Sequence, residues 1–524
     1  MRKILFTLFA LLSILPSWAQ EKGLAEIIND KFASATGWFV QGIFASIPVT
    51  KDVGIPWVVV VLLVSALAFT VYFKFINVTG LGTSINVVRG KYDDIDHIES
   101  DPNAAVNMVD GDVVGTISDE GEAGEVSHFQ ALTAALSGTV GLGNIAGVAI
   151  AISIGGPGAT FWMILAGLLG MTSKFAECTL GVKYRDVDAD GTVYGGPMYY
   201  LKKGLSEKNL AGLGNVLAIL FAIMCVGGSF GGGNMFQSNQ AAVIFNKTAG
   251  FTDDASGFYF GLIMAVLVGI VILGGLKRIA SVTEKVVPFM VGIYLLAAFI
   301  IIGANVDAIP TAFGEIWDGA FAPVGIAGGV VGVLVQGFRR AAFSNEAGVG
   351  SAAIAHSAVK TKYAASEGLV ALLEPLIDTV IVCTITALVI VITNGDGEIM
   401  QYGVKEADGV LATSKAFASV IPWFPYVLTF AVVLFAFSTM ISWSYYGLQS
   451  WLFIFGKSKT NETIYKVLFC IFTVIGASIT LGAVTDFSDA MIFAMAIPNL
   501  IGVFILLPKI KEEVSKYYQA IKSK

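Results

Sequence analysis

Residues 137–147 read SGTVGLGNIAG and lie within an apolar segment long enough to cross a lipid bilayer. Each Gly destabilises a helix by about 1 kcal/mol relative to Ala, so the four glycines here predict a break in the helix. Unpaired backbone groups are tolerated at membrane depth only where protein or a water-filled cavity surrounds them. The amides of such a break can bind an anion and its carbonyls can coordinate a cation. We therefore predict a binding site here; the alternative is a glycine-rich face packed against another helix.

The composition is typical of a membrane protein. Of the 524 residues, 55% are hydrophobic and only 14% are charged, whereas charged residues make up about 25% of an ordinary soluble protein. We predict an all-α polytopic membrane protein, with the lipid bilayer as a partner and no nucleic acid. The four Cys form no CxxC pair and the three His no HxxxH pair, which argues against an intramembrane zinc enzyme.

The N-terminus predicts the orientation. Residues 1–19 begin with two basic residues, continue with an apolar run and end with a small-x-small pattern, as a secretory signal peptide does. The run of about 12 apolar residues is shorter than the roughly 17 to 25 that cross a bilayer. Cleavage would leave residues 20–54 in a bacterial periplasm. We thus expect a protein of the bacterial cell inner membrane with its N-terminus periplasmic and its C-terminus cytoplasmic.

Apolar windows predict eleven membrane spans after the signal peptide. They lie near residues 55–77, 128–155, 158–184, 213–245, 258–275, 286–305, 322–343, 367–393, 424–449, 464–484 and 487–508. Lys and Arg are concentrated in the segments that this topology places in the cytoplasm, with Arg339 and Arg340 at the inner end of the seventh span. A helix-like run at 410–421 could cover the outer vestibule.

The spans suggest two repeats. The second span is interrupted at 138–147, and the seventh, five spans later, contains Gly325, Gly328, Gly329, Gly332 and Gly337. Interruptions in corresponding, oppositely oriented spans predict an inverted repeat. Coincidence among 59 glycines is the alternative. The predicted order is an extra helix at 55–77, a cytoplasmic acidic connector at 78–127, five-helix repeats at 128–305 and 306–508, and a cytoplasmic basic tail at 509–524.

Hydroxyl groups deep in the ninth span form a candidate cation site. Ser438 and Thr439 are adjacent in an apolar helix, and their oxygens, with carbonyls of the broken second span, are the hard ligands that sodium prefers. The alternative is that each hydroxyl bonds a carbonyl of its own helix.

Other polar residues also lie in predicted spans. Glu374 and Asp378 lie one turn apart, and their roles could be gating, cation coupling or hydrogen bonds between helices. Lys174 and Glu177 are three residues apart and are predicted to form a structural ion pair. Residues 231–240 read GGGNMFQSNQ, and their amides could select a polar substrate or join helices.

Three motifs resemble the alanine or glycine:cation symporter family: residues 155–163 (GGPGATFWM), 337–351 (GFRRAAFSNEAGVGS) and 435–446 (FAFSTMISWSYY). The resemblance covers about residues 124–508. Ile164 stands where a second Trp is usual, and the acidic connector is longer than expected. Residues 140–144 (VGLGN) are similar to the unwound first core helix of the leucine-transporter fold. The resemblance implies sodium-coupled symport of small neutral amino acids, alanine and glycine, by alternating access.

The resemblance also implies a site. Sodium would be coordinated by carbonyls of Ser137, Val140 and Phe435 and by the hydroxyls of Ser438 and Thr439. The predicted substrate-binding residues are Thr139, Gly141, Leu142, Gly143 and Asn144 near the substrate carboxylate, Gly332 and Gln336 at the seventh-span break near its ammonium, Gln237 as a polar contact, and Trp443. Trp443 lies one turn beyond Thr439 on the same helix face, where its ring would restrict the substrate side chain.

Two alternatives remain at this point. A transporter of the same fold could couple to protons through Glu374 or Asp378. A membrane-embedded enzyme or receptor is more remote, because the sequence has no GxSxG motif and no extramembrane domain of ordinary size. We expect no enzymatic activity and no cofactor, sodium being a transported ion.

Overall fold

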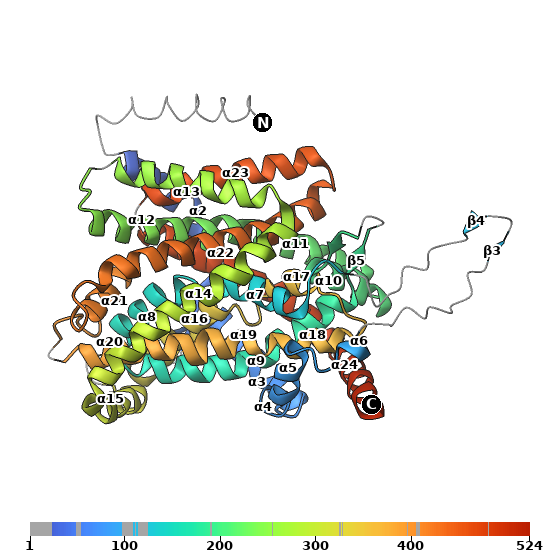
Figure 1. Cartoon of the computed structure of the whole chain (residues 1–524), viewed down its shortest axis with the longest axis horizontal. Coiled ribbons are helices and arrows are strands. Elements are labelled where there is room, and N and C mark those ends of the chain that lie inside the picture. The colour runs from blue at the N-terminus through green and yellow to red at the C-terminus, as the bar shows by residue number, and fades with distance from the viewer. Residues whose placement is uncertain are drawn as a thin grey trace.

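The computed structural model describes residues 24–524 except 49–53, 97–107, 110–111, 114–123, 189–190, 254, 324–325, 327, 396, 405–408 and 480. The predicted signal peptide at 1–19 and parts of the acidic connector (97–107, 110–111 and 114–123) lie outside the described residues. The described chain is predominantly helical (Figure 1). This confirms the all-α fold class.

The elements up to the middle of the chain are α2 (Leu24–Ile43), β1 (Ser46–Pro48), β2 (Gly54–Pro56), α3 (Trp57–Tyr72), α4 (Ile76–Thr79), α5 (Leu81–Val88), α6 (Asp93–Asp96), β3 (Met108–Val109), β4 (Asp112–Val113), α7 (His128–Thr139), η2 (Gly143–Gly147), α8 (Val148–Gly155), α9 (Ala159–Lys183), β5 (Asp186–Val187), β6 (Val193–Tyr194), α10 (Pro197–Glu207), α11 (Ala211–Phe230), η3 (Gly231–Met235), α12 (Phe236–Ala249) and α13 (Ser256–Ile272).

The remaining elements are α14 (Gly275–Ala304), η4 (Val306–Ala308), α15 (Ile309–Phe321), α16 (Gly329–Asn345), α17 (Ala352–His356), α18 (Ala364–Ala371), α19 (Leu373–Pro375), η5 (Leu376–Cys383), α20 (Thr384–Thr393), α21 (Gly409–Ala418), α22 (Phe424–Phe455), α23 (Lys459–Ser478) and α24 (Leu481–Ser523). The strands form three short antiparallel hairpins, β1 with β2, β3 with β4 and β5 with β6.

Several helices are suited to a bilayer. Among the described residues, 6 helices are long and apolar enough to cross it, or up to 7 when the bent pair α7 and η2–α8 is counted as one span. The apolar helices α3 and α13 are shorter. The predicted total of eleven spans therefore stays a prediction. The predicted basic tail at 509–524 continues α24 as helix up to Ser523.

The first predicted break is present. A capping box of Ser127 and Gln130 begins α7, which ends at Thr139. The chain then leaves helical geometry at Val140 and resumes as the π-helical segment η2, so the two halves of the span are bent by 51°. The loop helix α21 confirms the helix-like run predicted near 410–421. It packs on η2, where the Thr413 hydroxyl donates to the Ile145 carbonyl at 3.0 Å.

The second break lies later than predicted. Gly328 and Gly329 have positive φ values of 84° and 54° at the start of α16, whereas Gly332 and Gly337 lie inside this helix, and the chain unwinds again after Asn345. Glu346, Gly348 and Gly350 take positive φ values of 56°, 87° and 93° before α17 begins. Gly337 instead allows close packing, since a Cβ there would lie 2.6 Å from the Ala159 carbonyl oxygen of α9. The prediction of a break at Gly332 and Gly337 was wrong because glycine also marks close helix packing.

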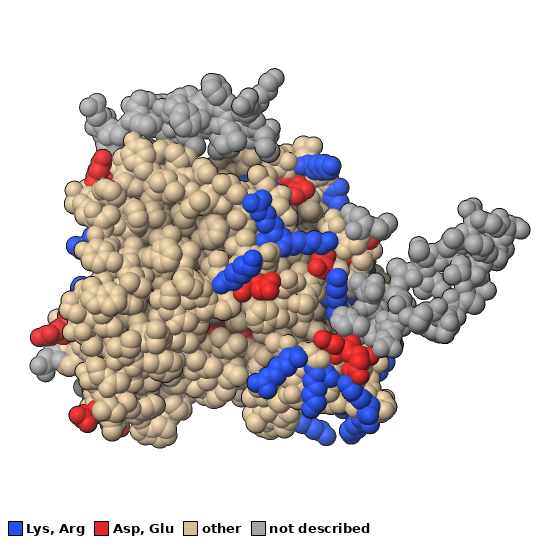
Figure 2. Space-filling view, viewed as in Figure 1, with Lys and Arg blue, Asp and Glu red and all other residues tan. Residues whose placement is uncertain are grey.

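Two arginines lie close to this break. Arg339 and Arg340 are in the last two turns of α16, and their predicted position at the inner end of the seventh span stays a prediction. Both contact Asp489 on α24, Arg339 through Nη2 at 2.7 Å. Figure 2 shows other Lys and Arg residues gathered at one end of the molecule, where α10, α6 and the C-terminus lie in Figure 1.

Candidate functional site

The first break is fixed by hydrogen bonds to a distant helix. The Gly141 N–H donates to Asn144 Oδ1 at 2.8 Å, and Asn144 Nδ2 donates to Asp378 Oδ1 at 2.7 Å and to the Asp378 carbonyl at 3.0 Å. Ser344 of α16 donates to Asp378 Oδ2 at 2.9 Å. Because these side chains are buried, their pairing offsets the cost of desolvating polar groups. Asp378 thus connects the first break, α16 and the π-helical segment η5.

Gln237 joins the break to the glycine-rich segment of the fourth predicted span. Its Oε1 accepts from the Leu142 N–H at 3.4 Å, and its Nε2 donates to the Gly232 carbonyl at 3.0 Å. Gly232 belongs to the π-helical segment η3. The Leu142 contact is long and therefore weak. A stronger acceptor such as a carboxylate could therefore displace Gln237 Oε1 from the Leu142 N–H. Two other amides of this segment join helices: Asn234 donates to the Phe469 carbonyl at 2.7 Å and Asn239 to the Gly476 carbonyl at 3.2 Å, both on α23.

The residues predicted to bind sodium lie together. Ser137 of α7 donates to the Ser438 carbonyl of α22 at 2.7 Å. Ser438 Oγ donates to the Phe435 carbonyl of its own helix at 3.0 Å, which is the alternative considered from the sequence. Val140, between α7 and η2, is fully buried. The structure therefore brings the first break against the hydroxyl pair of α22.

Thr439 differs from its neighbour Ser438. Its hydroxyl oxygen is buried and has no hydrogen-bond partner. A Cβ built on Gly141 would lie 2.5 Å from this oxygen, so the hydroxyl faces the unwound backbone directly. A buried polar group without a partner costs about 1 to 3 kcal/mol. An oxygen that bears this cost beside a helix break is well suited to coordinate a hard cation.

Trp443 lies between η3 and the second break. Its ring is buried against Gly233, where a Cβ would lie 2.2 Å from the Trp443 Cγ atom. Its Nε1–H donates to Glu346 Oε1 at 3.0 Å. The sequence did not single out Glu346, although the motif 337–351 contains it. Its positive φ and buried carboxylate identify it as part of the second break.

Two predicted site residues lie elsewhere. Gly332 and Gln336 were expected at the seventh-span break, but both lie within α16, before it unwinds. Gln336 packs against the end of α8, since a Cβ on Gly155 would lie 3.1 Å from the Gln336 Cβ. Thr139 ends α7, and its hydroxyl faces the Ala135 carbonyl of the same helix at 3.3 Å. Gly143 begins η2 next to Ser344.

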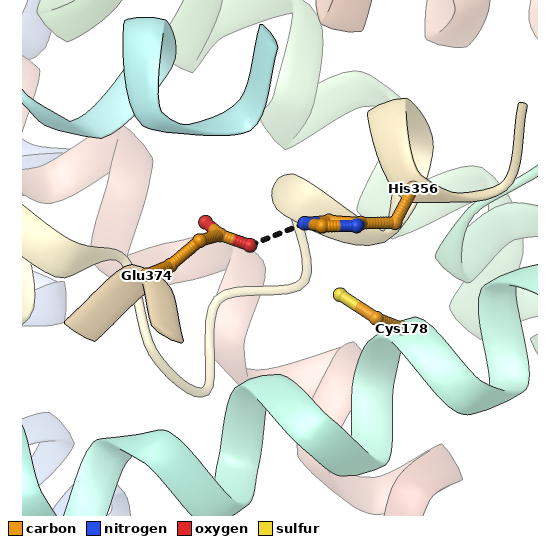
Figure 3. A group of neighbouring side chains, drawn as sticks. All are labelled: Cys178, His356 and Glu374. Atoms are coloured by element: carbon orange, nitrogen blue, oxygen red, sulfur yellow. Dashed lines mark hydrogen bonds and ion pairs between the residues drawn. The ribbon is translucent and has the colours of Figure 1, made fainter. Parts of the chain in front are cut away.

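The buried charges pair differently from the prediction. Lys174 Nζ lies 3.2 Å from Glu374 Oε2, while Glu177 accepts from Asn499 at 2.6 Å, so the expected Lys174–Glu177 ion pair was wrong. Glu374 and Asp378, one turn apart, have separate sets of partners. Glu374 also contacts His356, which the sequence reasoning passed over (Figure 3).

Comparisons with known proteins agree with this geometry. The model of the sodium:alanine symporter family matches residues 41–524. The sodium/alanine symporter AgcS of Methanococcus maripaludis is 39% identical over 406 residues, which cover 77% of this chain and 87% of AgcS. A Bacillus subtilis protein described as "Probable sodium/glutamine symporter GlnT" is 35% identical, covering 73% of this chain and 76% of that protein. The crystal structure of MhsT in complex with L-phenylalanine matches with a TM-score of 0.53 at 14% identity, covering 73% of this chain and 89% of MhsT. The last comparison confirms the fold expected from residues 140–144.

Proposed function

The chain belongs to the sodium:alanine symporter family, and we propose that it carries small neutral amino acids, chiefly alanine and glycine, into the cell together with sodium. That it is a cation-coupled amino-acid transporter and not an enzyme follows from the family. In this proposal the protein lies in the bacterial inner membrane, with the N-terminus periplasmic and the C-terminus cytoplasmic.

The observation that carries the sodium assignment is the unpartnered Thr439 hydroxyl beside Gly141. Sodium is coordinated there by this oxygen, by the carbonyl of Ser137 in the last turn of α7 and by the carbonyl of Val140 in the unwound segment. Ser438 contributes less directly, because its hydroxyl already bonds the Phe435 carbonyl. Hard oxygen ligands without formal charge suit a monovalent cation that must be released again.

The amino acid binds next to the sodium. Its carboxylate meets the amides of Leu142 and Gly143 and displaces the long contact of Leu142 with Gln237. Its ammonium lies toward the second break, where the Glu346 carboxylate accepts from Trp443 Nε1. The Trp443 ring then limits the side chain, because its buried position against Gly233 leaves it no room to move away.

The substrate assignment is tested by uptake of labelled alanine into proteoliposomes that contain the purified protein. Unlabelled glycine, serine, valine, leucine and glutamine are added as competitors. We expect glycine and serine to compete and leucine and glutamine to compete poorly, since extra methylenes in a packed site cost about 1 to 3 kcal/mol. Competition by glutamine equal to that by glycine would contradict the small-substrate assignment.

A further inference from the structure

A continuous row of titratable side chains runs through the described part of the protein, apart from the proposed substrate site. His128 Nδ1 contacts Glu367 Oε2, Glu367 Oε1 contacts His356 Nδ1, and His356 Nε2 lies 2.5 Å from Glu374 Oε1. Glu374 Oε2 lies 3.2 Å from Lys174 Nζ. We call these five residues the buried ionisable chain. All are buried, and only His128 has measurable side-chain exposure, at 7%.

The geometry requires a shared proton. A neutral imidazole has one N–H and one acceptor nitrogen, yet both nitrogens of His356 face carboxylate oxygens. With both carboxylates ionised and the ring neutral, a nitrogen lone pair would face an oxygen lone pair. A further proton, on the ring or on one of the carboxyl groups, converts that repulsion into a hydrogen bond. The cluster is therefore built to hold a proton that can be removed.

The surroundings favour a proton over a metal ion. Cys178, His356 and Glu374 offer ligand atoms within 4.8 Å of one another (Figure 3). However, the Lys174 ammonium already contacts this Glu374 carboxylate, and a metal cation would be repelled by it. The other ionisable groups around the chain are Glu177 on α9, Arg185 after it, Glu346 in the second break and Tyr446 on α22.

The His128 end of the buried ionisable chain borders a hollow of about 210 Å³. Polar residues of its lining are Asp93, Ser127, His128 and Lys360, and α5 contributes Val87 and Val88. The predicted topology places this hollow on the cytoplasmic side. His128 lines this hollow, whereas Lys174 at the other end of the buried ionisable chain is fully buried.

The chain also connects the two broken spans. His128 is the first residue of α7, before the first break, and His356 is the last residue of α17, after the second break. Glu367 on α18 lies between them and contacts both. Movement of α7 away from α18 would separate His128 from Glu367 and expose the Glu367 carboxylate to the hollow.

We propose that the buried ionisable chain is a proton-binding site that exchanges its proton with water in this hollow during the transport cycle. When α7 moves, the N–H bond at His356 Nδ1 breaks and an O–H bond forms at Glu367. That proton then passes from Glu367 to water. His356 is left neutral, and its remaining N–H, at Nε2, donates to Glu374. The reverse movement takes the proton back. This goes beyond the proposed function, which needs no proton.

The test is alanine uptake by proteoliposomes under a fixed sodium gradient, with the pH of each compartment varied separately from about 5 to 8, the range in which histidine titrates. For the parent protein we expect a several-fold change in rate with the pH on the side of the hollow. Glu367→Gln should remove this dependence, because an amide keeps the shape but cannot accept the proton. Glu284→Gln is the matched control. Glu284 accepts a hydrogen bond from Gln130 of α7 at 3.0 Å but is not a member of the buried ionisable chain.

If Glu367→Gln does not fold, His128→Gln serves as the second variant, because it changes only the outermost member. A rate in the parent that is independent of pH on that side would overturn the proposal, as would a dependence that both variants retain. Absence of alanine uptake at every pH would contradict the proposed substrate instead. In that case a pH dye in unbuffered detergent solution can follow proton release when sodium and the carried amino acid are added. Release by the parent protein that Glu367→Gln removes would support the proton site, and no release by the parent would overturn it.

Discussion

Asn144 in the first helix break and Asp378 in η5 are joined by two hydrogen bonds, one to the carboxylate at 2.7 Å and one to the main-chain carbonyl at 3.0 Å. The same Asn144 accepts from the Gly141 N–H. The shape of the unwound backbone therefore depends on a residue more than 200 positions away in the sequence. This relationship leads to the first prediction.

Asn144→Ala should weaken alanine binding by about 10- to 100-fold, since a hydrogen bond to a charged group contributes about 1.5 to 3 kcal/mol. Without Asn144, the Gly141 amide loses its acceptor and the break can adopt other conformations. Equilibrium binding of labelled alanine at saturating sodium measures the effect. The control is Asn305→Ala, whose amide bonds only the Ile301 carbonyl of its own helix. Equal affinities in both variants would contradict this role.

Thr439→Ala should raise the sodium concentration needed for half-maximal uptake by about tenfold or more, a loss of at least about 1.4 kcal/mol. Ser438→Ala should have a smaller effect, because that hydroxyl is already bonded within α22. Thr439→Ser keeps the oxygen and should restore most of the sodium affinity. Alanine affinity should fall together with sodium affinity, since coupling between two ligands is reciprocal. A stronger effect of Ser438→Ala would reverse the assignment.

Two glycines of the first break form a matched pair. Gly141→Ala should abolish uptake, because the added Cβ would lie 2.5 Å from Thr439 Oγ1. Gly147→Ala should be tolerated, since nothing lies within 4 Å of its Cβ position and its φ of −63° is helical. Uptake and thermal stability of both purified variants provide the measurements. Loss of activity in Gly147→Ala would show that the unwound region is longer than described.

Trp443→Ala should admit larger neutral amino acids and weaken the binding of alanine. The reason is that the Trp443 ring, which packs against Gly233, would no longer border the proposed site. Trp443→Phe keeps most of the ring but loses the donor to Glu346, so it should keep the selectivity at reduced affinity. Competition of labelled alanine uptake by valine and leucine distinguishes the two variants. If leucine competes equally in the parent and in Trp443→Ala, the ring does not set the size of the pocket.

A cysteine at Ser523 tests the orientation. Ser523 is the last residue of α24 and belongs to the tail at 509–524, which the proposed topology places in the cytoplasm. In intact cells, Ser523→Cys should not react with a membrane-impermeant thiol reagent until the membrane is permeabilised. Labelling before permeabilisation would show that the C-terminus lies outside.

The sequence predicted local features well and long-range partners poorly. The first break was located correctly because the four glycines that predict it all lie within residues 137–147, where the helix is interrupted. The second break was misplaced because a glycine such as Gly337, which lets α16 approach α9, looks the same in sequence as one that unwinds a helix. Gly348 and Gly350, with positive φ, mark the actual break.

The buried ionisable chain was missed for a related reason. Only three histidines are present and none is paired by spacing, so the sequence offered no metal or catalytic motif. The contacts of His356 with Glu367 and Glu374 depend on how α17, α18 and α19 fold together. Likewise, Lys174 pairs with Glu374 across helices although Glu177 is its neighbour on α9.

In the proposed function sodium drives amino-acid uptake, and imposed ion gradients test this coupling. Proteoliposomes containing the purified protein are given an inward sodium gradient without a pH difference, or an inward proton gradient without sodium. We predict that labelled alanine accumulates above its equilibrium level under the sodium gradient and that Thr439→Ala strongly reduces this accumulation. Accumulation driven by the proton gradient alone, with no response to sodium, would contradict the account.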